Sequence, residues 1–474
     1  MRGVIVAGGG PVGMLLAAEL GRLGVPTTVV EKLAETHDEP RAGTLHARTA
    51  QSLLRRGYLP PPPRPGDPHA VVEVPFHFGG RPVLTVESPA IEGAPMINQA
   101  QSDIERFFEA QARARGVEVR RGHRITDVRD HGDRVTVTTD HGELTAEYVV
   151  GCDGARSTVR EAAGITGTTH PATFAGILGL ARLADPARVP GGWTQGPTGW
   201  TLINVNAAGY SRVLTHEFPE PLPERGAPVT LEELRAAASR ILGRDVPMSD
   251  PVFLGRFSDF TRLADTYRRG RILLAGDAAH VHAPLGGQGL NLGLQDAINL
   301  GWKLAMVIAG TAPETLLDTY HAERHPVAEA VIENTRAQAA LMRPGPEFEP
   351  LRALVADLLS TPDGNRLLSD RISGQGVRYC AGPGLDGAFL PNFVLGEQSV
   401  AELLSPGRPV LLLGSGMHGL ADAAAGWKDG VDVVEHQHDL GAPAVLVRPD
   451  GYVAWAGRGA EQAIAALTTW FGPR

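Results

Sequence analysis

The stretch Val4-Ile5-Val6-Ala7-Gly8-Gly9-Gly10-Pro11-Val12-Gly13, near the N-terminus, decides the fold. Its apolar residues predict a buried strand, the residues from Pro11 to Leu23 predict a helix, and those from Thr27 to Glu31 predict a second strand. This order is a βαβ unit, and the glycines lie at the turn between its first strand and its helix. Glycines spaced as G-x-G-x-x-G at such a turn are typical of a Rossmann-like domain that binds a dinucleotide.

Each part of this turn has a physical role in binding a dinucleotide. Gly8 permits the tight turn, Gly10 lets the backbone approach a pyrophosphate, and Gly13 lets the helix pack closely on the strand. Glu31 ends the second strand, where its carboxylate can bind the adenosine ribose. A glycine-rich turn without a ligand is the alternative, but strand, helix and acid together favour the dinucleotide site.

The composition describes an ordinary globular protein of about two or three domains, with 474 residues, 43% hydrophobic and 20% charged. The net charge of -9 is spread along the chain without a basic cluster, so neither nucleic acid nor a membrane surface is an expected partner. The two cysteines, Cys152 and Cys380, have no metal-ligand spacing. With no signal peptide and no apolar run near the roughly 18 residues of a membrane span, we expect a soluble cytoplasmic protein.

The middle of the chain alternates between helix and strand patterns. Pro60 to Pro68 holds six prolines in nine residues and predicts an extended surface connection. Ser102 to Gly116 predicts a helix. Strands are predicted from Arg124 to Val128, from Arg134 to Thr139 and from Leu144 to Val150.

The pattern changes from about Pro171 to Thr266, where strands bounded by Gly and Pro surround one helix, opened by the capping box at Thr230. The α/β pattern of the first domain resumes after Thr266. It has a predicted strand from Arg271 to Ala275 and long helices from about Gly289 to Ile308 and from Pro313 to Met342. The expected boundaries are residues 1–75, 98–170 and 267–345 for an interrupted Rossmann-like domain, residues 76–97 and 171–266 for a mostly β domain, and residues 382–474 for an α/β C-terminal domain.

Two later turns narrow the kind of dinucleotide. Gly151-Cys152-Asp153-Gly154-Ala155-Arg156-Ser157 follows one apolar strand, and Gly276-Asp277-Ala278-Ala279-His280 follows another, with Pro284-Leu285-Gly286-Gly287-Gln288-Gly289-Leu290-Asn291 soon after. These segments resemble the DG and GD motifs of the class A, single-component FAD-dependent aromatic hydroxylases, which include p-hydroxybenzoate hydroxylase and the oxygenases of aromatic polyketide pathways. The motifs occur in the family's order, and the resemblance covers nearly the whole chain.

The resemblance implies FAD as the cofactor and assigns residues to it. Asp277 would bind the ribityl chain, and Asp153 with Gly154 would shape the cleft where flavin and nicotinamide meet, although an ordinary turn residue is an equal alternative for Asp153. Gln99 and Arg41 match FAD-contacting residues, with exposed surface positions as their alternatives. The expected cofactor-binding residues are Gly8, Gly10, Val12, Gly13, Glu31, Lys32, Arg41, Gln99, Ile125, Asp153, Gly154, Asp277, Gly286, Gly287, Gly289, Leu290 and Asn291.

The loop from Pro284 to Asn291 also has a physical logic of its own. Reduced flavin carries negative charge near N1 and the C2 oxygen, which backbone N–H groups at the start of the following helix can stabilise. Gly286, Gly287 and Gly289 would let the backbone lie against the flat ring. A flexible turn before an ordinary core helix is the alternative.

In the family that the chain resembles, NADPH or NADH reduces FAD, the reduced flavin reacts with O2, and a C4a-hydroperoxyflavin delivers oxygen to an electron-rich ring. We therefore expect an enzyme without a nucleophile triad or metal site, and no certain catalytic side chain, with Arg41 and Pro284 near the flavin. His280 and His282 lack a third metal ligand nearby. The expected substrate is a bulky aromatic or polycyclic, polyketide-like molecule, in a pocket lined by residues 174–260, including Trp193 and Trp200.

A second G-x-G-x-x-G, from Gly414 to Gly419, follows the apolar strand Pro409 to Leu413 and precedes Glu435. A separate nicotinamide domain is one interpretation. The other is that Leu390 to Trp455 resembles the thioredoxin-like tail of larger family members. Because CxxC is absent, we expect this tail to pack against the rest of the chain or to form an oligomer contact, not to carry out redox chemistry. For the whole protein we expect a monomer or a homodimer.

Other outcomes stay open on the same scaffold. A Baeyer–Villiger oxygenase or an epoxidase is the nearest alternative, whereas a flavin halogenase is disfavoured because the WxWxIP signature is absent. From a different class, the chain could be a flavin-binding protein without catalytic activity.

Overall fold

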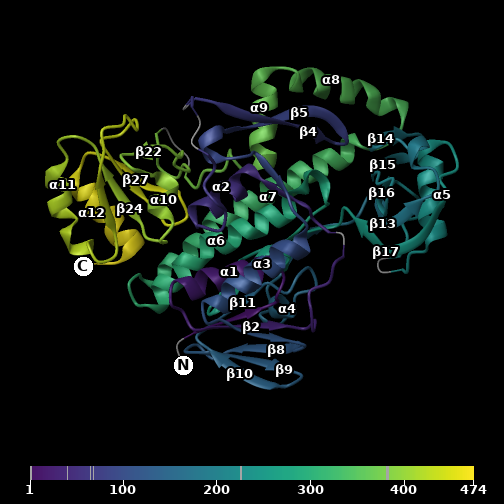
Figure 1. The fold of residues 1–474 in the computed structure, drawn as a ribbon. Helices are drawn as coiled ribbons and strands as arrows, with labels where there is room; N and C mark the ends of the chain where they lie inside the picture. The colour runs from purple at the N-terminus through teal and green to yellow at the C-terminus, as the bar shows by residue number, and fades with distance from the viewer. Residues whose placement is uncertain are drawn as a thin grey trace.

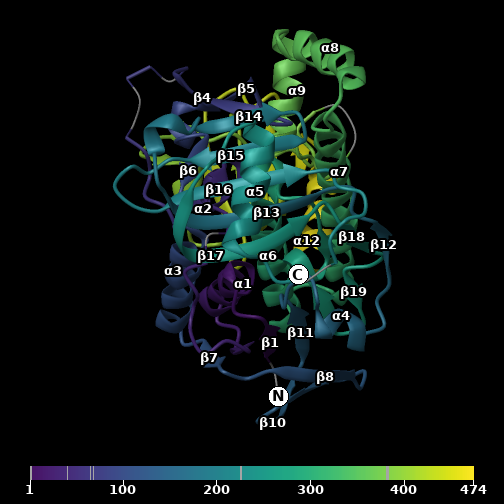
Figure 2. The ribbon, with the colours of Figure 1, turned by 90° about the vertical axis from the view of Figure 1, so that its right-hand side faces the viewer.

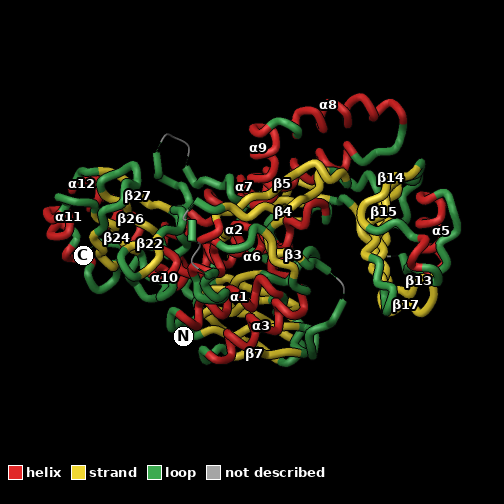
Figure 3. The backbone as a smooth tube through the Cα atoms, turned by 45° about the horizontal axis from the view of Figure 1, so that its top comes forward, coloured by secondary structure: helices red, strands yellow, loops and turns green. Residues whose placement is uncertain are grey.

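The computed structural model describes residues 3–39, 41–63, 66–67, 69–224, 227–380 and 384–473. Pro40, and Pro65 and Pro68 of the proline-rich connection, lie outside this part of the chain. A central α/β body carries the C-terminal domain on one side and a β-sheet capped by helix α5 on the opposite side (Figures 1 and 3).

The central sheet has six strands in the order β19-β20-β11-β1-β2-β7, and all neighbours are parallel except β19 and β20. The strands are β1 (Val4–Ala7), β2 (Thr27–Glu31), β7 (Glu118–Arg121), β11 (Tyr148–Gly151), β19 (Arg268–Arg269) and β20 (Ile272–Leu274). Helix α1 (Pro11–Arg22) packs against α3 (Gln101–Ala114) and α6 (Gln288–Ile308). Since helices cover this sheet, its central strands β1, β11 and β20 are buried throughout, as their continuous apolar runs predict. The parallel order places the carboxyl ends of these three strands at one edge.

The prediction of a single strand from Leu144 to Val150 is wrong. Strand β10 (Gly142–Ala146) pairs with β9 (Val135–Thr139), which pairs with β8 (Ile125–Asp130), and β11 begins only at Tyr148 in the central sheet. The chain changes sheets at Glu147, whose N–H donates to the carbonyl of Gly3 at 3.0 Å. No Gly or Pro marks this change, so the apolar residues on either side look continuous in the sequence.

A five-stranded antiparallel sheet forms the lateral domain, in the order β14-β15-β16-β13-β17. The strands are β13 (Ala175–Leu183), β14 (Gly192–Gly196), β15 (Gly199–Asn204), β16 (Ser211–Glu217) and β17 (Met248–Ser258). Helix α5 (Leu231–Leu242) covers one face, and Ile177 and Val213 pack against its Leu234. Figures 1 and 2 show α5 on the side of this sheet that lies away from the central body. Because side chains alternate along a strand, the residues next to those that pack under α5 face the central body. The Thr230 hydroxyl accepts a hydrogen bond from Glu233 N, so the predicted cap is confirmed.

Smaller elements connect the domains. They are β3 (Thr44–His46) paired with β6 (Met96–Asn98); the hairpin of β4 (Val71–Phe78) and β5 (Arg81–Pro89); the sheet of β12 (Gly167–His170), β18 (Thr261–Ala264) and β21 (His280–Val281); and the helices α2 (Ala47–Arg55), α4 (Thr158–Ala162), α7 (Asp318–Leu341), α8 (Glu349–Leu359) and α9 (Pro362–Ser373). Strand β4 runs across the boundary that we placed between residues 75 and 76. Short 3-10 turns, including η3 (Gly276–Ala278) and η4 (Leu285–Gly287), precede α6.

The C-terminal domain has a four-stranded sheet in the order β25-β24-β26-β27, with β24 and β25 parallel and the other neighbours antiparallel. This is the thioredoxin-like arrangement that the resemblance implies. Its elements are β22 (Val394–Leu395), β23 (Gln398–Ser399), α10 (Val400–Leu404), β24 (Val410–Leu413), α11 (His418–Ala423), β25 (Asp432–Glu435), β26 (Ala444–Val447), β27 (Val453–Gly457) and α12 (Ala460–Phe471). Across the described ranges, no helix is both long and apolar enough to cross a membrane.

Candidate active site

The three glycine-containing turns meet at the carboxyl edge of the central sheet. Cys152 N donates to the carbonyl of Ala7 at 2.7 Å, and Ala275 N donates to the carbonyl of Gly151 at 2.9 Å. A Cβ built on Gly8 would lie 2.3 Å from the Cys152 carbonyl oxygen. The first and second turns are therefore in backbone contact, and the third adjoins the second.

Arg160, in α4, ties the second turn to the third. Its guanidinium donates to the carbonyl of Ala278 at 2.9 Å and to that of Ala155 at 3.1 Å. From the first turn, the side chain of Val12 lies 3.2 Å from where a Cβ of Gly276 would be. Segments about 270 residues apart in the chain thus form one contiguous surface, as a single extended ligand requires.

The glycines of the first turn divide into two kinds. Gly8 has φ of 107°, and a Cβ on Gly13 would lie 2.1 Å from the Gly8 carbonyl oxygen, so both positions require glycine for packing. A Cβ on Gly10 would meet no neighbouring segment within 4 Å, and no side chain caps α1. The N-terminus of α1 therefore offers free backbone N–H groups beside open space, which fits a phosphate group.

Glu31 is only 8% exposed and closes the other end of this turn. Gly9 N donates to one carboxylate oxygen of Glu31 at 2.6 Å, and Leu33 N donates to the other at 2.8 Å. Each oxygen keeps a further acceptor position, so ribose hydroxyls can still donate to it. Lys32 beside it is exposed, and Ile125 is half-buried at the start of β8.

The carboxylate of Asp153 is used inside the protein. Ser157 Oγ donates to Oδ1 at 2.5 Å and Val159 N donates to Oδ2 at 3.1 Å, which fixes the start of α4. Burial raises the pKa of Asp153. The neighbouring Gly154 has φ of 85° and open space around its Cα. Asp153 therefore acts as a cap that shapes the turn, and the surface open to a ligand is that of Gly154.

Asp277 has the opposite environment. Its side chain is exposed and has no hydrogen-bond partner within the described chain, yet the surrounding protein raises its pKa by desolvation, while the charges of His280 and Arg41 act in the lowering direction. An accessible carboxylate that is largely surrounded by protein and has no partner is suited to bind hydroxyl groups of a ligand.

The loop from Pro284 to Asn291 is held in place rather than free. Gly286 and Gly287 have φ of 70° and 63°, a backbone that side chains rarely adopt. His46 Nε2 lies 2.9 Å from the Gly286 carbonyl oxygen, and Asn291 accepts from His46 N at 2.7 Å while donating to the Gly287 carbonyl oxygen at 2.9 Å. These contacts attach the loop to β3, which disfavours the interpretation as a flexible turn.

The remaining glycine of this loop is also sterically restricted. A Cβ on Gly289 would lie 3.3 Å from His282 Nε2, and the following Leu290 is buried in the central core. Backbone rather than side chains therefore lines the start of α6.

Sequence reasoning missed Asp296, a fully buried acid in α6. Its carboxylate accepts from Gly276 N at 3.1 Å, lies 2.6 Å from His280 Nε2 and accepts from Arg324 Nε at 2.8 Å. Burial alone would raise the pKa of Asp296, but the neighbouring His280 and Arg324 hold it below its usual range. The available signal in the sequence was that Asp296 is the one acidic residue of α6. His280 thus supports the turn that carries Asp277, and in the part of the chain described no three His, Cys, Asp or Glu side chains gather as metal ligands.

Arg41 and Gln99 lie at the same end of the β3–β6 ladder. Gln99 N donates to the Gly43 carbonyl oxygen at 3.1 Å, and the carbonyl of Arg41 accepts from Arg212 of β16 at 3.1 Å. The Arg41 side chain is mostly exposed and donates to Glu39 at 2.7 Å. Both residues therefore lie near β3, to which the loop from Pro284 to Asn291 is attached. Their contact with a cofactor stays a prediction.

An aromatic cluster joins the lateral sheet to the loop before α6. Phe174 and Trp200 of the lateral domain are buried together with Ala283 and Leu285 of the loop, and Trp193 packs against them half-buried. Trp200 donates its indole N–H to a main-chain carbonyl at the end of α7, so it is part of the core. Trp193 is the more accessible of the two tryptophans predicted to line a pocket.

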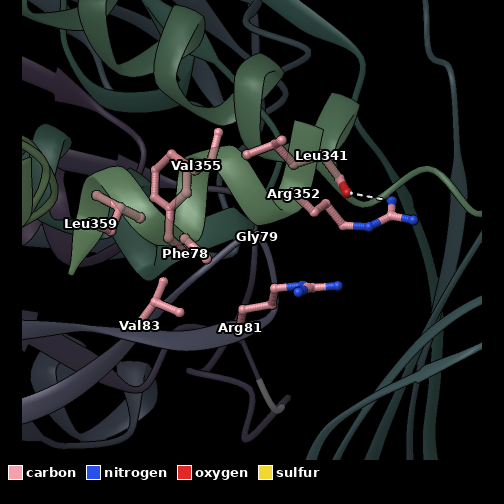
Figure 4. Close-up of a pocket in the computed structure, with 9 residues that line it drawn as sticks. Phe78, Gly79, Arg81, Val83, Leu341, Arg352, Val355 and Leu359 are labelled. Atoms are coloured by element: carbon pink, nitrogen blue, oxygen red, sulfur yellow. Dashed lines mark hydrogen bonds between the residues drawn. The ribbon is translucent and has the colours of Figure 1, made fainter. Parts of the chain in front are cut away.

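Two further cavities are too small for a dinucleotide or a polycyclic ligand. One, of about 10 Å³, lies beneath α8, where Phe78, Val83 and Leu359 meet while the guanidinium groups of Arg81 and Arg352 point away (Figure 4). The other, of about 50 Å³, lies between α6, α7 and α9. They have room for about one and about four water molecules respectively.

Comparison with known proteins identifies the family. The model for an FAD binding domain matches residues 2–335, and the model for the C-terminal domain of aromatic-ring hydroxylases matches residues 383–473. The chain belongs to the FAD-dependent aromatic-ring hydroxylases. Its cofactor is FAD, and the protein is an FAD-dependent monooxygenase.

Among its relatives is the 12-dehydrotetracycline 5-monooxygenase/anhydrotetracycline 6-monooxygenase of Streptomyces rimosus, 40% identical over 99% of both chains. The dialkyldecalin synthase of Streptomyces rugosporus is 39% identical, again over 99% of both chains. The structure of the anhydrotetracycline hydroxylase from Streptomyces rimosus superposes with a TM-score of 0.88 at 39% identity, covering 100% of each chain. The whole fold, including the thioredoxin-like tail, is thus shared with these proteins.

Proposed function

We propose that this protein hydroxylates a bulky, mostly apolar polycyclic aromatic molecule, with O2 as the oxidant and NADPH or NADH as the reductant. FAD supplies the oxygen-activating chemistry when it is bound. The protein's own residues orient the cofactor and the substrate and keep water away from the reacting atoms.

The observation that carries this proposal is the face of the lateral sheet turned toward the loop before α6. Leu178, Leu202 and Phe253 lie on this face by strand alternation, and all three are half-buried rather than packed in a core. Apolar side chains left partly accessible beside a cofactor loop are typical of a site for a large apolar ligand. Anhydrotetracycline, after which two of the relatives are named, is a large molecule of fused rings.

The residues proposed to hold FAD are those of the three turns. Gly10 and the N-terminus of α1 would receive the pyrophosphate, Glu31 the adenosine ribose and Asp277 the ribityl hydroxyls. The backbone at Gly286, Gly287 and Gly289 would face the flavin ring, where N–H groups at the start of α6 stabilise negative charge on the reduced ring.

A decisive test is purified holoenzyme with 18O2, NADPH or NADH, and a panel of polycyclic phenols. We expect substrate-stimulated oxidation of the nicotinamide and one labelled oxygen atom in the product. Insertion of the label into a new lactone would instead indicate a Baeyer–Villiger reaction. An unstimulated nicotinamide signal with no label in any product would refute the monooxygenase assignment for this substrate class.

A second candidate, ring closure by a Diels–Alder reaction, follows from the Diels-Alderase among the similar solved structures, which is 36% identical and covers 100% of both chains. The same samples separate the two, because a cyclised product forms without nicotinamide consumption and without label. We further propose that the protein works in a reducing compartment and that it is a monomer or a homodimer. Size-exclusion chromatography with light scattering would test the oligomeric state.

A further inference from the structure

A row of aromatic rings connects the loop before α6 with the lateral sheet. His46 contacts Phe76 edge-on at 5.5 Å between ring centroids, Phe76 stacks on His77 at 4.5 Å, and His77 lies 5.0 Å from Trp193. Trp193 in turn lies 5.2 Å from His216. Two imidazoles, from the β4–β5 hairpin and from β16, therefore contact the same indole.

His216 projects from β16 toward the central body. Val213, on the opposite face of this strand, packs under α5, so strand alternation places His216 on the other side. The imidazole is 1% exposed and is surrounded by the rings of Phe174, Phe257 and Trp193 at 5.1–5.4 Å. Its Nδ1 is buried and has no hydrogen-bond partner in the described part of the chain.

His77 repeats this arrangement from the hairpin. Its Nδ1 is also buried without a partner, between the rings of Phe76 and Trp193. Burial lowers the pKa of His77 to about 4 and that of His216 to about 3, and their mutual repulsion adds to the effect on His216. Both imidazoles are therefore neutral near pH 7, and each has one N–H donor and one nitrogen acceptor.

Two buried polar groups without partners, side by side in an aromatic environment, are costly to a fold unless a ligand completes them. The half-buried Leu178, Leu202 and Trp193 show that this face of the sheet stays accessible. Hydroxyl and carbonyl oxygens match the neutral imidazoles, whereas a carboxylate would need a cation beside it.

We propose that His77 and His216 are specificity-determining residues that hydrogen-bond hydroxyl or carbonyl oxygens along one edge of a polycyclic phenol or quinone, with its rings packed against Trp193. This inference deepens the proposed function and rests on it. It adds that the substrate is selected by an oxygenated edge within an otherwise apolar site.

The test is equilibrium dialysis of holoenzyme with 1,5-dihydroxynaphthalene and with naphthalene, which share a ring system and differ in the hydroxyl groups. Wild-type protein is expected to bind the dihydroxy compound about tenfold or more tightly than naphthalene, as one or two hydrogen bonds imply. His77→Phe and His216→Phe should each remove most of this preference while keeping the affinity for naphthalene.

Asparagine variants separate recognition from packing. Because the Asn side chain places an amide close to where imidazole Nδ1 lies, His216→Asn and His77→Asn should restore part of the preference that Phe removes. His131→Phe, on the exposed β8–β9 hairpin, is the control and should match the wild type. Thermal unfolding and flavin content are measured on every variant.

An unchanged preference in both Phe variants, or no preference in the wild type, would overturn the inference. The binding measurement does not depend on turnover. A preference that the Phe variants abolish, together with no 18O in any product, would mean that the imidazoles recognise the ligand as inferred and that the proposed reaction is wrong.

Discussion

The chain contains the same glycine pattern twice, and the structure gives the two copies different roles. Both Gly8–Gly13 and Gly414–Gly419 follow a buried strand, precede a helix and are followed by a parallel strand that ends in a glutamate. At the first copy, Gly13 is in contact with backbone and the following helix has 12 residues. At the second, a Cβ built on Gly419 would meet no other part of the described chain within 4 Å, and the helix has six residues.

The two glutamates differ in the same way. Glu31 is buried and accepts from the backbone of its own glycine turn, whereas Glu435 is exposed and pairs with the exposed His418 at 3.1 Å. Close packing of the helix N-terminus against the strand end therefore distinguishes the first glycine pattern, which we propose binds phosphate, from the second. The second copy lies in a thioredoxin-like domain, in which the loop after the first long strand needs no such contact.

The difference between the two glycine patterns predicts that the C-terminal domain contributes to the stability of the protein and not to FAD binding. Glu323 of α7 is buried between Lys303, at 2.7 Å, and Arg448 of the C-terminal domain, at 2.5 Å. Glu323→Ala removes the ion-pair partner of the buried Lys303, whereas Arg448 keeps its pair with Asp450. The uncompensated charge of Lys303 should destabilise the protein by about 3–5 kcal/mol. Chemical denaturation measures the loss, and the affinity of the folded fraction for FAD should stay near the wild-type value.

The same cluster sets an acid dependence. Burial alone would raise the pKa of Glu323, but Arg448 and Lys303 hold it at about 2, below its ordinary value of 4.5. Its stabilising contribution is present above pH 4.5 and is lost as the pH falls toward 2. A denaturation series in which wild type and Glu323→Ala stay equally far apart down to pH 2 would contradict this.

The glycines themselves give a matched pair. Gly13→Ala places a methyl group 2.1 Å from a backbone oxygen and should cost about 3 kcal/mol, with loss of bound FAD. Gly419→Ala meets open space inside a helix and should stabilise by up to about 1 kcal/mol. Thermal unfolding and flavin absorbance compare them, and equal effects would abolish the distinction between the two motifs.

The acids give a second pair. Glu31→Gln should weaken FAD binding about 10-fold to 100-fold, because hydrogen bonds to a charged acceptor contribute roughly 1.5–3 kcal/mol. Glu435→Gln should leave it unchanged. Titration of apoprotein with FAD, followed by flavin fluorescence, gives both constants, and full FAD occupancy of Glu31→Gln at nanomolar protein would argue against the ribose assignment.

The smallest effect is expected at Asp277. Asp277→Asn should weaken FAD about tenfold by removing a charged acceptor. Because the pKa of Asp277 is raised in the folded state, the wild-type apoprotein loses stability as the pH rises through the window above 3.8. The Asn variant should therefore melt slightly higher at pH 7 and equally at pH 3. A lower melting temperature at pH 7 would show that the carboxylate has a partner inside the protein.

Local residue patterns predicted most of the fold and the three glycine-containing turns that meet at the edge of the central sheet. Apolar runs and glycine turns marked β1, α1, β2 and α6, and the capping sequence marked the start of α5. The split between β10 and β11 escaped prediction, since a change of sheet at Glu147 needs no turn residue. Asp296 and the buried imidazoles escaped because their roles depend on partners distant in the chain.

By itself, the sequence determined which backbone can turn tightly, since only glycine adopts the conformations found at Gly8, Gly286 and Gly287 without strain. It also determined where apolar segments must be buried. Only the tertiary structure decided which of the two glycine patterns meets another segment closely, that Asp277 has no hydrogen-bond partner in the described chain, and that His77 and His216 contact one indole. The physical reason is that hydrogen bonding and burial are properties of contacts, and these contacts join segments tens to hundreds of residues apart.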